Sequence, residues 1–310
     1  MIKKKPLVSI LINCFNGEKF VKEAIECVLS QSYKNWELIL WDNQSTDNSA
    51  NIFKSFKDKR LKYYYSSKHT HLGGGRARAY PKLKGELIAI IDTDDIWFPS
   101  KLKKQVNEFT DKEIGLVISN AYKFTENKKK PLFGKNIPKS GYVFNDLLND
   151  YFVCLPTLIF RRSFVEKLNI SFDPDFNYIS DFDLVMRLSS ISKLKYIDEI
   201  LAGWRLHGQN ASLKKPFLFL EEKEIWINKI LNNEPYISKN YPVSILKFKK
   251  NLLRQKALFL LFENKRIDAF KLILKTKCRS IKDLFVFCLI ISQISSKILK
   301  KMYLKKISKI

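Results

Sequence analysis

An apolar run that leads directly into a cluster of acids is the feature that most limits what this chain can fold into. Residues 88–91 read Ile-Ala-Ile-Ile, and Asp92, Asp94 and Asp95 follow at once. Four consecutive apolar residues predict a strand with both faces covered. Such a strand brings its carboxylates to the carboxyl edge of a sheet, where open α/β folds bind ligands. A solvated acidic loop that caps the next helix is the alternative interpretation.

Three carboxylates packed this closely repel one another, so the pattern predicts a positive charge among them. Hard divalent cations such as Mg²⁺ and Mn²⁺ take oxygen ligands and often bridge to substrate phosphates. We therefore expect a divalent-metal site at the end of this strand.

The first hundred residues alternate between short apolar runs and segments with helical spacing. We expect helices at residues 18–31, from Ser45 or Asp47 to about 57, and at 76–84, with a flexible loop at 72–75 and strands at 7–12, 36–41, 61–65 and 87–91. This alternation predicts an α/β fold with a mostly parallel sheet and right-handed crossovers. Parallel strands end at one edge of the sheet, so Asn13, Asp42 and the acidic cluster should converge there.

The pattern changes after residue 100. We expect helices at 101–109, 163–168 and 181–191, strands at 114–119 and 156–161, and an entirely helical chain after about residue 213. The 310 residues carry a net charge of +25, and residues 211–310 hold 23 basic and 7 acidic side chains. A basic region of this kind suits anionic lipid or nucleic acid, and a solubilising surface is the alternative.

Cysteine spacing and the apolar runs exclude several classes of protein. The five cysteines are scattered without a CxxC pair, which argues against a disulfide framework or a zinc site and fits a reducing compartment. The first residues lead into a strand without an apolar signal segment. No run reaches the roughly 20 apolar residues of a membrane-spanning helix.

Three segments carry a resemblance to a known family. Residues 8–16 (VSILINCFN), 41–47 (WDNQSTD) and 92–99 (DTDDIWFP) occur in the order and spacing of the inverting family 2 glycosyltransferases of GT-A fold. The chain resembles members that build bacterial surface polysaccharide or lipopolysaccharide, over about residues 6–212. The resemblance implies a catalytic domain at 1–213, with a nucleotide-binding half at 1–100 and an acceptor half at 101–213, followed by a basic helical region at 214–310.

The resemblance also implies a role for each matching residue. Asp181 would be the general base; the nucleotide would be bound by Asn13, Asp42 (to the base, usually uracil), Arg78 and Asp92; and Mn²⁺ or Mg²⁺ would be held by Asp94, with His207 close to the metal or diphosphate. Alternatives stay open at three of these positions. Asp181 can instead cap the helix, and Asp183 can replace it as the base. Arg78 can be a surface cation, and His207 a hydrogen-bonded core residue.

The implied reaction transfers a single sugar from a nucleotide-sugar, with UDP as the expected carrier, to a saccharide or lipid-linked acceptor. The Gln-x-x-Arg-Trp motif and spanning helices of the processive synthases are absent from the sequence. A catalytically inactive scaffold of the same fold is one alternative. A nucleic-acid-binding protein is the other, but the sequence holds no recognised nucleic-acid motif, so we expect no nucleic-acid partner.

The basic tail predicts contact with a membrane surface. Residues 284–291 are apolar, and lysines follow at 300–301 and 305–306. A short apolar run flanked by lysines suits the interface of an anionic bilayer. We therefore expect a cytoplasmic protein held peripherally on the inner face of the cell membrane; helices packed on the catalytic domain or in a dimer are the alternative.

Overall fold

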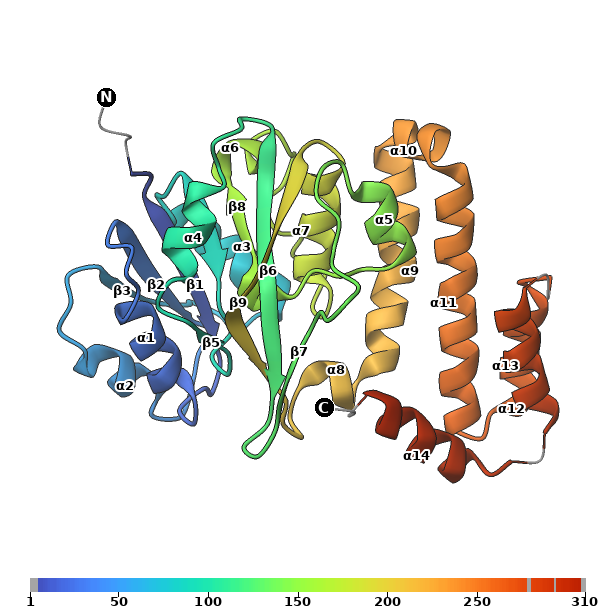
Figure 1. The fold of residues 1–310 in the computed structure, drawn as a ribbon. Helices are drawn as coiled ribbons and strands as arrows, with labels where there is room; N and C mark the ends of the chain where they lie inside the picture. Colours follow the sequence, from blue (N-terminus) through green and yellow to red (C-terminus); the bar gives the residue numbers. More distant parts are fainter. Residues whose placement is uncertain (1–4, 278–279, 293, 308–310) are drawn as a thin grey trace. The chain divides into compact units, whose positions relative to one another are not determined.

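The computed structural model describes residues 5–277, 280–292 and 294–307, which fall into two compact units (Figure 1). The first unit holds the described residues up to 147 together with 151–208. The second holds residues 148–150 and the described residues from 209 onward. The sequence places its domain boundary nearby, at residue 213. Of the predicted basic region, residues 278–279, 293 and 308–310 lie outside the described residues, and nothing is described of the side chains beyond residue 301.

Four parallel strands form one half of the sheet in the first unit. In spatial order they are β3 (Leu61–Tyr65), β2 (Trp36–Asp42), β1 (Val8–Cys14) and β4 (Leu87–Ile90). β1 and β2 are almost entirely buried, because helices cover both faces of the sheet. The four predicted strands are confirmed, with ends that differ by one or two residues.

The other half of the sheet mixes directions. β8 (Ile159–Arg161) pairs antiparallel with β4 and with β6 (Ile114–Phe124), and β6 pairs parallel with β9 (Lys193–Arg205). β5 (Ile96–Trp97) and β7 (Lys129–Pro131) complete the sheet through antiparallel pairs. The sequence analysis missed β9, whose first half alternates lysines with apolar residues and stays half exposed.

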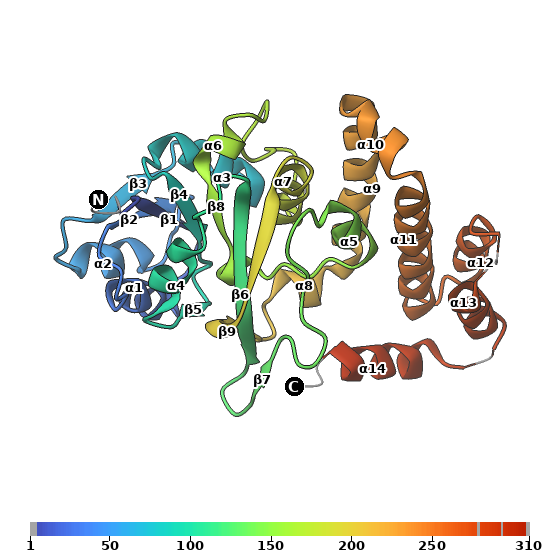
Figure 2. The same ribbon diagram turned by 45° about the horizontal axis from the view of Figure 1, so that its top comes forward.

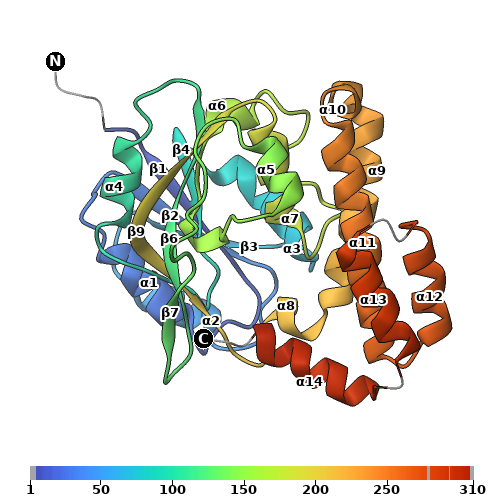
Figure 3. The same ribbon diagram turned by 45° about the vertical axis from the view of Figure 1, so that its right-hand side comes forward.

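Helices cover both faces of this sheet. α1 (Val21–Leu29) and α4 (Lys101–Asn107) lie on one face, and α3 (Leu72–Ala79) and α7 (Ser180–Ser189) lie on the opposite face (Figure 3). The short helices α2 (Ser49–Ser55), α5 (Phe144–Asn149) and α6 (Arg162–Val165) lie in the connections. Apolar side chains of β1, β2, β4 and α1 form the core between sheet and helices.

The predicted glycine loop at 72–75 is wrong, because these residues form the first turn of α3. Glycine is a poor helix former, which is why the sequence favours a loop. Here the missing side chains allow close packing: a Cβ on Gly73 would lie 2.0 Å from the carbonyl oxygen of Phe176, and one on Gly75 would lie 2.5 Å from Oδ1 of Asn13. α3 ends at Ala79, and a 3₁₀ turn at Tyr80–Lys82 replaces the predicted continuation.

The second unit is helical throughout its described residues, as the sequence predicts (Figure 2). Its helices are α8 (Ala211–Lys214), α9 (Pro216–Asn233), α10 (Pro235–Asn240), α11 (Pro242–Phe262), α12 (Arg266–Leu274), α13 (Ile281–Ile291) and α14 (Ser296–Ile307). Residues of α11 to α14 share one small core.

Two general properties complete the description. Over the part of the chain that is described, no helix combines the length and the apolar character needed to cross a bilayer. Four cysteines, Cys14, Cys27, Cys154 and Cys288, are free thiols, and Cys278 lies outside the described residues.

Candidate active site

The acidic cluster lies where the sequence predicts it, at the carboxyl ends of the parallel strands. Asp92, Asp94 and Asp95 follow β4, and one carboxylate oxygen of each lies within 4.8 Å of the others. Asp92 and Asp94 are partly exposed, whereas Asp95 is buried. The carboxylates therefore form one compact, strongly negative site.

Asp92 is paired with an arginine that the sequence analysis did not select. Nη2 of Arg76, on α3, donates a 3.0 Å hydrogen bond to Oδ1 of Asp92. The pKa of Asp92 is raised to about 6, mainly by desolvation; the Arg76 cation acts in the opposite direction, and the charges of Asp94 and Asp181 contribute to the rise. Arg76 is only 1% exposed, and its Nε and Nη1 find no hydrogen-bond partner among the described residues. A buried guanidinium with two unused donor groups is suited to bind an anionic ligand.

Arg205 at the end of β9 holds the backbone of the acidic loop. Its backbone N–H donates to Oδ1 of Asp95 at 3.0 Å, and its Nε donates to the backbone oxygen of Asp94 at 2.9 Å. Its Nη2 forms an ion pair with Glu23 of α1. Desolvation raises the pKa of Asp95 well above its usual range, and the charges of Asp94 and Asp92 add to this effect. Arg205 and Glu23 thus fix the loop that carries the acids.

Asp94 and His207 come together as the sequence predicts. Nε2 of His207 lies 2.8 Å from Oδ2 of Asp94, although 113 residues separate them in the sequence. The His207 ring stacks on Phe20, with 5.3 Å between ring centroids. Both side chains keep 23% of their surface exposed, so the alternative of a buried core histidine does not apply.

The two aspartates at the start of α7 have different surroundings. Asp183 is buried and forms a bidentate ion pair with Arg187 one turn later, with Nε at 3.0 and 3.1 Å from its two oxygens. Asp181 is partly exposed, and its negative charge contributes to the raised pKa of Asp92. Asp181 is therefore the aspartate of α7 that lies near the acidic cluster.

Asn13 and Asp42 lie on neighbouring strands, at the ends predicted to converge. Oδ1 of Asn13, on β1, is buried and finds no hydrogen-bond partner among the described residues. Asp42, at the end of β2, is fully buried and accepts hydrogen bonds from the Ser45 N–H at 2.7 Å and the Tyr63 hydroxyl at 2.6 Å. These bonds give Asp42 a structural role in the loop after β2, and its contact with a nucleotide base stays a prediction.

Arg78 occupies a position different from that of Arg76. Its Nη2 donates to the Ser67 hydroxyl at 2.6 Å, and its guanidinium lies over the ring of Trp41, 5.9 Å from the ring centroid. It therefore lies beside the segment after β3, whereas Arg76 reaches Asp92. A nucleotide contact by Arg78 stays a prediction.

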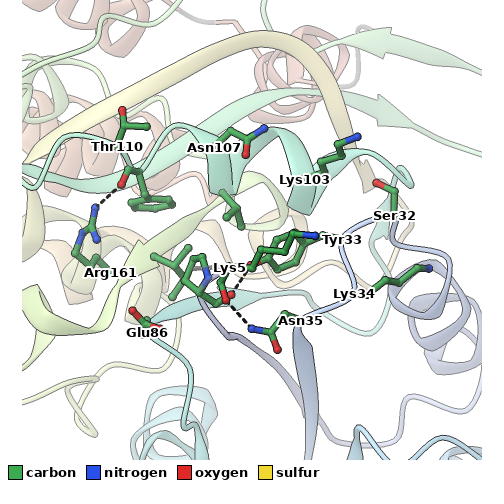
Figure 4. Close-up of a pocket in the computed structure, with 14 residues that line it drawn as sticks. Lys5, Ser32, Tyr33, Lys34, Asn35, Glu86, Lys103, Asn107, Thr110 and Arg161 are labelled. Carbon is green, nitrogen blue, oxygen red and sulfur yellow. Dashed lines mark hydrogen bonds between the residues drawn. The ribbon is translucent and has the colours of Figure 1, made fainter. Parts of the chain in front are cut away.

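A cavity of about 840 Å³ lies at the other edge of the sheet (Figure 4). It is lined by residues that precede β1, β2 and β4, among them Lys5, Asn35 and Glu86, and by Arg161. Arg161 donates to the backbone oxygens of Phe109 and Ile114, both at 3.1 Å. None of the predicted site residues lines this cavity. We place the active site at the acidic edge, where carboxylates, a histidine and a buried arginine converge.

The donor groups of the acidic cluster fit a divalent cation. Three carboxylates and one imidazole lie together, and burial and the negative charges of neighbouring aspartates raise the pKa values of Asp92 and Asp95. Oxygen-rich ligand sets suit Mg²⁺ and Mn²⁺. Since Asp92 and Asp95 are held by Arg76 and by the Arg205 N–H, Asp94 and His207 are the side chains best placed to reach a cation.

Comparison with known proteins identifies the family. The sequence model described as Glycosyl transferase family 2 matches residues 9–169. UDP-Glc:alpha-D-GlcNAc-diphosphoundecaprenol beta-1,3-glucosyltransferase WfgD of Escherichia coli is 30% identical over 166 residues. Those residues make up 54% of this chain and 64% of WfgD, which is less than two thirds of that relative's length.

Solved structures agree on the fold. Mannosyltransferase PcManGT from Pyrobaculum calidifontis, in complex with GDP-Man and Mn²⁺, superposes with a TM-score of 0.63 at 13% identity, over 99% of this chain and 88% of that one. S. aureus TarS 1–349, in complex with UDP-GlcNAc, gives 0.59 at 14% identity, over 91% and 90% of the two chains. The family match extends over more than half of the sequence and the fold agrees with it, so this chain belongs to glycosyltransferase family 2 and has the GT-A fold.

Proposed function

We propose that this glycosyltransferase transfers a single sugar from a UDP-sugar, with inversion at the anomeric carbon. The observation that carries the proposal is the convergence of Asp94, His207, Arg76 and Asp181 at one edge of the sheet. Cations and metal ligands at one place suit a diphosphate, and a carboxylate beside them suits the activation of a hydroxyl group.

The donor is bound at the ends of β1, β2 and β4. In this proposal Asn13, Asp42 and Arg78 contact the nucleoside, and Asp92 contacts the ribose; Asn13 and Asp42 end neighbouring strands, and Arg78 lies beside the segment after β3. The two unused donor groups of Arg76 support a role in binding the anionic part of the ligand. The two solved structures named above hold UDP-GlcNAc and GDP-Man, and WfgD is named for UDP-Glc. The choice of uracil for this chain therefore rests mainly on the resemblance at Asp42.

Asp94 and His207 would hold the divalent cation. A Mn²⁺ or Mg²⁺ bound there would neutralise the diphosphate and stabilise the departing nucleoside diphosphate. Arg205 and Glu23 keep the loop that carries Asp94 in place. The protein therefore orients the leaving group before the acceptor arrives.

Asp181 is the general base. Its carboxylate takes the proton from the acceptor hydroxyl while the hydroxyl oxygen bonds to the anomeric carbon, and the bond from that carbon to the diphosphate oxygen breaks. Because the acceptor attacks on the face opposite to the leaving group, the anomeric configuration inverts. Asp183 cannot take this role while both of its oxygens are bound to Arg187.

We propose a saccharide or lipid-linked acceptor in the synthesis of cell-surface glycans. WfgD is named for an acceptor on diphosphoundecaprenol, which is a membrane lipid carrier. An enzyme that acts on such an acceptor works at the inner face of the cytoplasmic membrane, and the basic C-terminal region suits peripheral attachment there.

Calorimetric titration with UDP, GDP, CDP and TDP, each with and without Mn²⁺, tests the donor site. We expect Mn²⁺-dependent binding of UDP that is lost in Asp94→Ala and retained in Asp111→Ala, which changes an exposed acid beside Arg161 at the other edge of the sheet. Binding of another nucleotide would replace UDP as the carrier. If the folded protein binds no nucleotide, the donor site is wrong and an inactive scaffold becomes the better interpretation.

The substitution Asp181→Asn tests the chemical step. We expect UDP affinity close to that of the wild type and a loss of sugar transfer of at least about a hundredfold, the usual contribution of a general base. Asp111→Asn is the matched control. Transfer at the wild-type rate by Asp181→Asn would exclude Asp181 as the base, and a retained anomeric configuration, read by NMR of the product, would exclude inversion.

A further inference from the structure

We propose that the outer face of α13, together with exposed apolar residues of α12, is the surface that docks this enzyme on an anionic lipid bilayer. This inference rests on the peripheral location proposed above and names the surface responsible for it. It is independent of the donor site and of the transfer reaction.

α13 is apolar on both of its faces. Its inner face contributes Val286 and Ile290 to the core of the second unit. Its outer face consists of apolar and thiol side chains that are all exposed, with Ile281 at 88%, Phe285 at 61% and Ile291 at 62%, together with Leu284 and Cys288. These positions fall within about a third of the helix circumference at the helical repeat of 3.6 residues. A helix that is apolar all round normally has both faces covered, so the outer face indicates a missing partner.

α12 extends the same apolar surface. Its exposed apolar residues Ile267, Phe270 and Leu274 recur at three- and four-residue spacing and share one face. The ring of Phe270 contacts the ring of Phe287 on α13, with 5.7 Å between centroids. The two helices therefore present a connected apolar surface.

Contacts within the second unit hold α13 in this orientation. Its N-terminus carries a capping box between Ser280 and Asp283, and Asp283 is buried beside Arg254, with Nε at 3.4 Å. Its C-terminal carbonyl groups accept hydrogen bonds from Arg266 of α12, at 2.7 Å from Ile290 and 2.6 Å from Ser292. The outer face is a fixed feature of this unit, because both helix ends are bound on the inner side.

The charge around this surface selects anionic lipid. The sequence from 271 to 301 holds eight basic residues and a single acid, Asp283, which is 1% exposed. Seven of these basic residues are exposed lysines, on or next to α12, α13 and α14: Lys271, Lys275, Lys277, Lys282, Lys297, Lys300 and Lys301. A second copy of the chain would bring like charges together, whereas anionic headgroups neutralise them.

Vesicle sedimentation of the full chain tests this surface. Wild-type protein is mixed with phosphatidylcholine vesicles with and without about one third phosphatidylglycerol, and we expect binding that depends on the anionic lipid. Leu284→Gln/Phe285→Gln should weaken binding at least about tenfold, because two apolar side chains no longer enter the interface. The matched control is Val243→Gln/Leu246→Gln, which changes two exposed apolar residues of α11 and should bind like the wild type. Lys271→Gln should weaken binding to anionic vesicles about fivefold.

A fluorescent label on Cys288 gives a readout that does not depend on a destabilising variant. We expect its emission to shift to shorter wavelength on anionic vesicles, with labelled Cys288→Ser as the background. Equal binding by wild type and Leu284→Gln/Phe285→Gln would exclude this surface and leave the peripheral location intact. No binding by the wild type would exclude both the surface and the location. A change from dimer to monomer in the double variant, seen by light scattering without vesicles, would make the surface an interface between two copies and overturn the proposal.

Discussion

Replacing Gly73 by alanine separates the two physical effects that act on α3. Gly73 lies in a helix with ordinary helical backbone angles, so alanine should favour the helix by about 1 kcal/mol. Against this, a Cβ at residue 73 would lie 2.0 Å from the carbonyl oxygen of Phe176 and 2.7 Å from that of Asp173. Cβ atoms in proteins essentially never lie closer than 3.0 Å to such atoms, so the helix or the 173–176 segment must move by about 1 Å.

The cost of this movement should exceed the gain in helix propensity. Overpacking of a close-packed site costs about 1–3 kcal/mol and sometimes more. Both contacts here involve backbone oxygens of buried residues, Asp173 and Phe176, so we expect the upper part of that range. The net effect is a destabilisation of about 1–2 kcal/mol, or a melting temperature about 2–8 °C lower for a unit of this size. Arg76 lies one turn further along α3, so affinity for the nucleotide should also fall.

Thermal unfolding of Gly73→Ala, with Gly134→Ala as the control, measures this balance. A Cβ on Gly134 meets nothing within 4 Å, so this variant should lie within about 0.5 kcal/mol of the wild type. A melting temperature of Gly73→Ala equal to or above that of the wild type would refute the reasoning, because helix propensity alone predicts that result.

Two further predictions concern charges in the first unit. Burial raises the pKa of Glu37, but the hydrogen bond from Lys62 at 2.6 Å and other donors outweigh this effect and lower the pKa overall. The charged form of Glu37 therefore stabilises the fold above pH 4.5, and this contribution is lost as the pH falls below that value. Glu37→Gln should therefore cost about 1–3 kcal/mol in urea unfolding at pH 7 and much less at pH 3, and an equal cost at both pH values would contradict this account. Arg76→Lys should weaken Mn²⁺-dependent UDP binding at least about tenfold in calorimetry, because lysine lacks the planar guanidinium that lies beside Asp92. Arg78→Lys should have a smaller effect. The reverse order of the two effects would make Arg78 the main contact.

The parts of the site that the sequence predicts are those fixed by local order along the chain. Asp92 and Asp94 follow an apolar strand directly, so their place at the sheet edge depends only on recognising that strand. Arg76, which reaches Asp92, is not among the residues predicted from the sequence, because the residue of α3 that faces the cluster depends on the rotation of α3 about its axis. That rotation is set by the contacts of glycine with Phe176 and Asn13, which no periodicity reveals.

The choice between Asp181 and Asp183 also depends on the orientation of a helix, but here the sequence holds the information that separates them. Residues two positions apart differ by about 200° around a helix, so only one of these side chains can face the acidic cluster. Asp183 is four residues before Arg187, at the spacing where helical side chains meet, and the two form a buried bidentate pair. The ion pair with Arg187 therefore gives Asp183 a structural role. Asp181, on the other side of the helix, is the residue that can face Asp92. Because that arginine is visible in the sequence, a search for basic partners at i, i+4 spacing is enough to separate the two acids by their sequence positions alone.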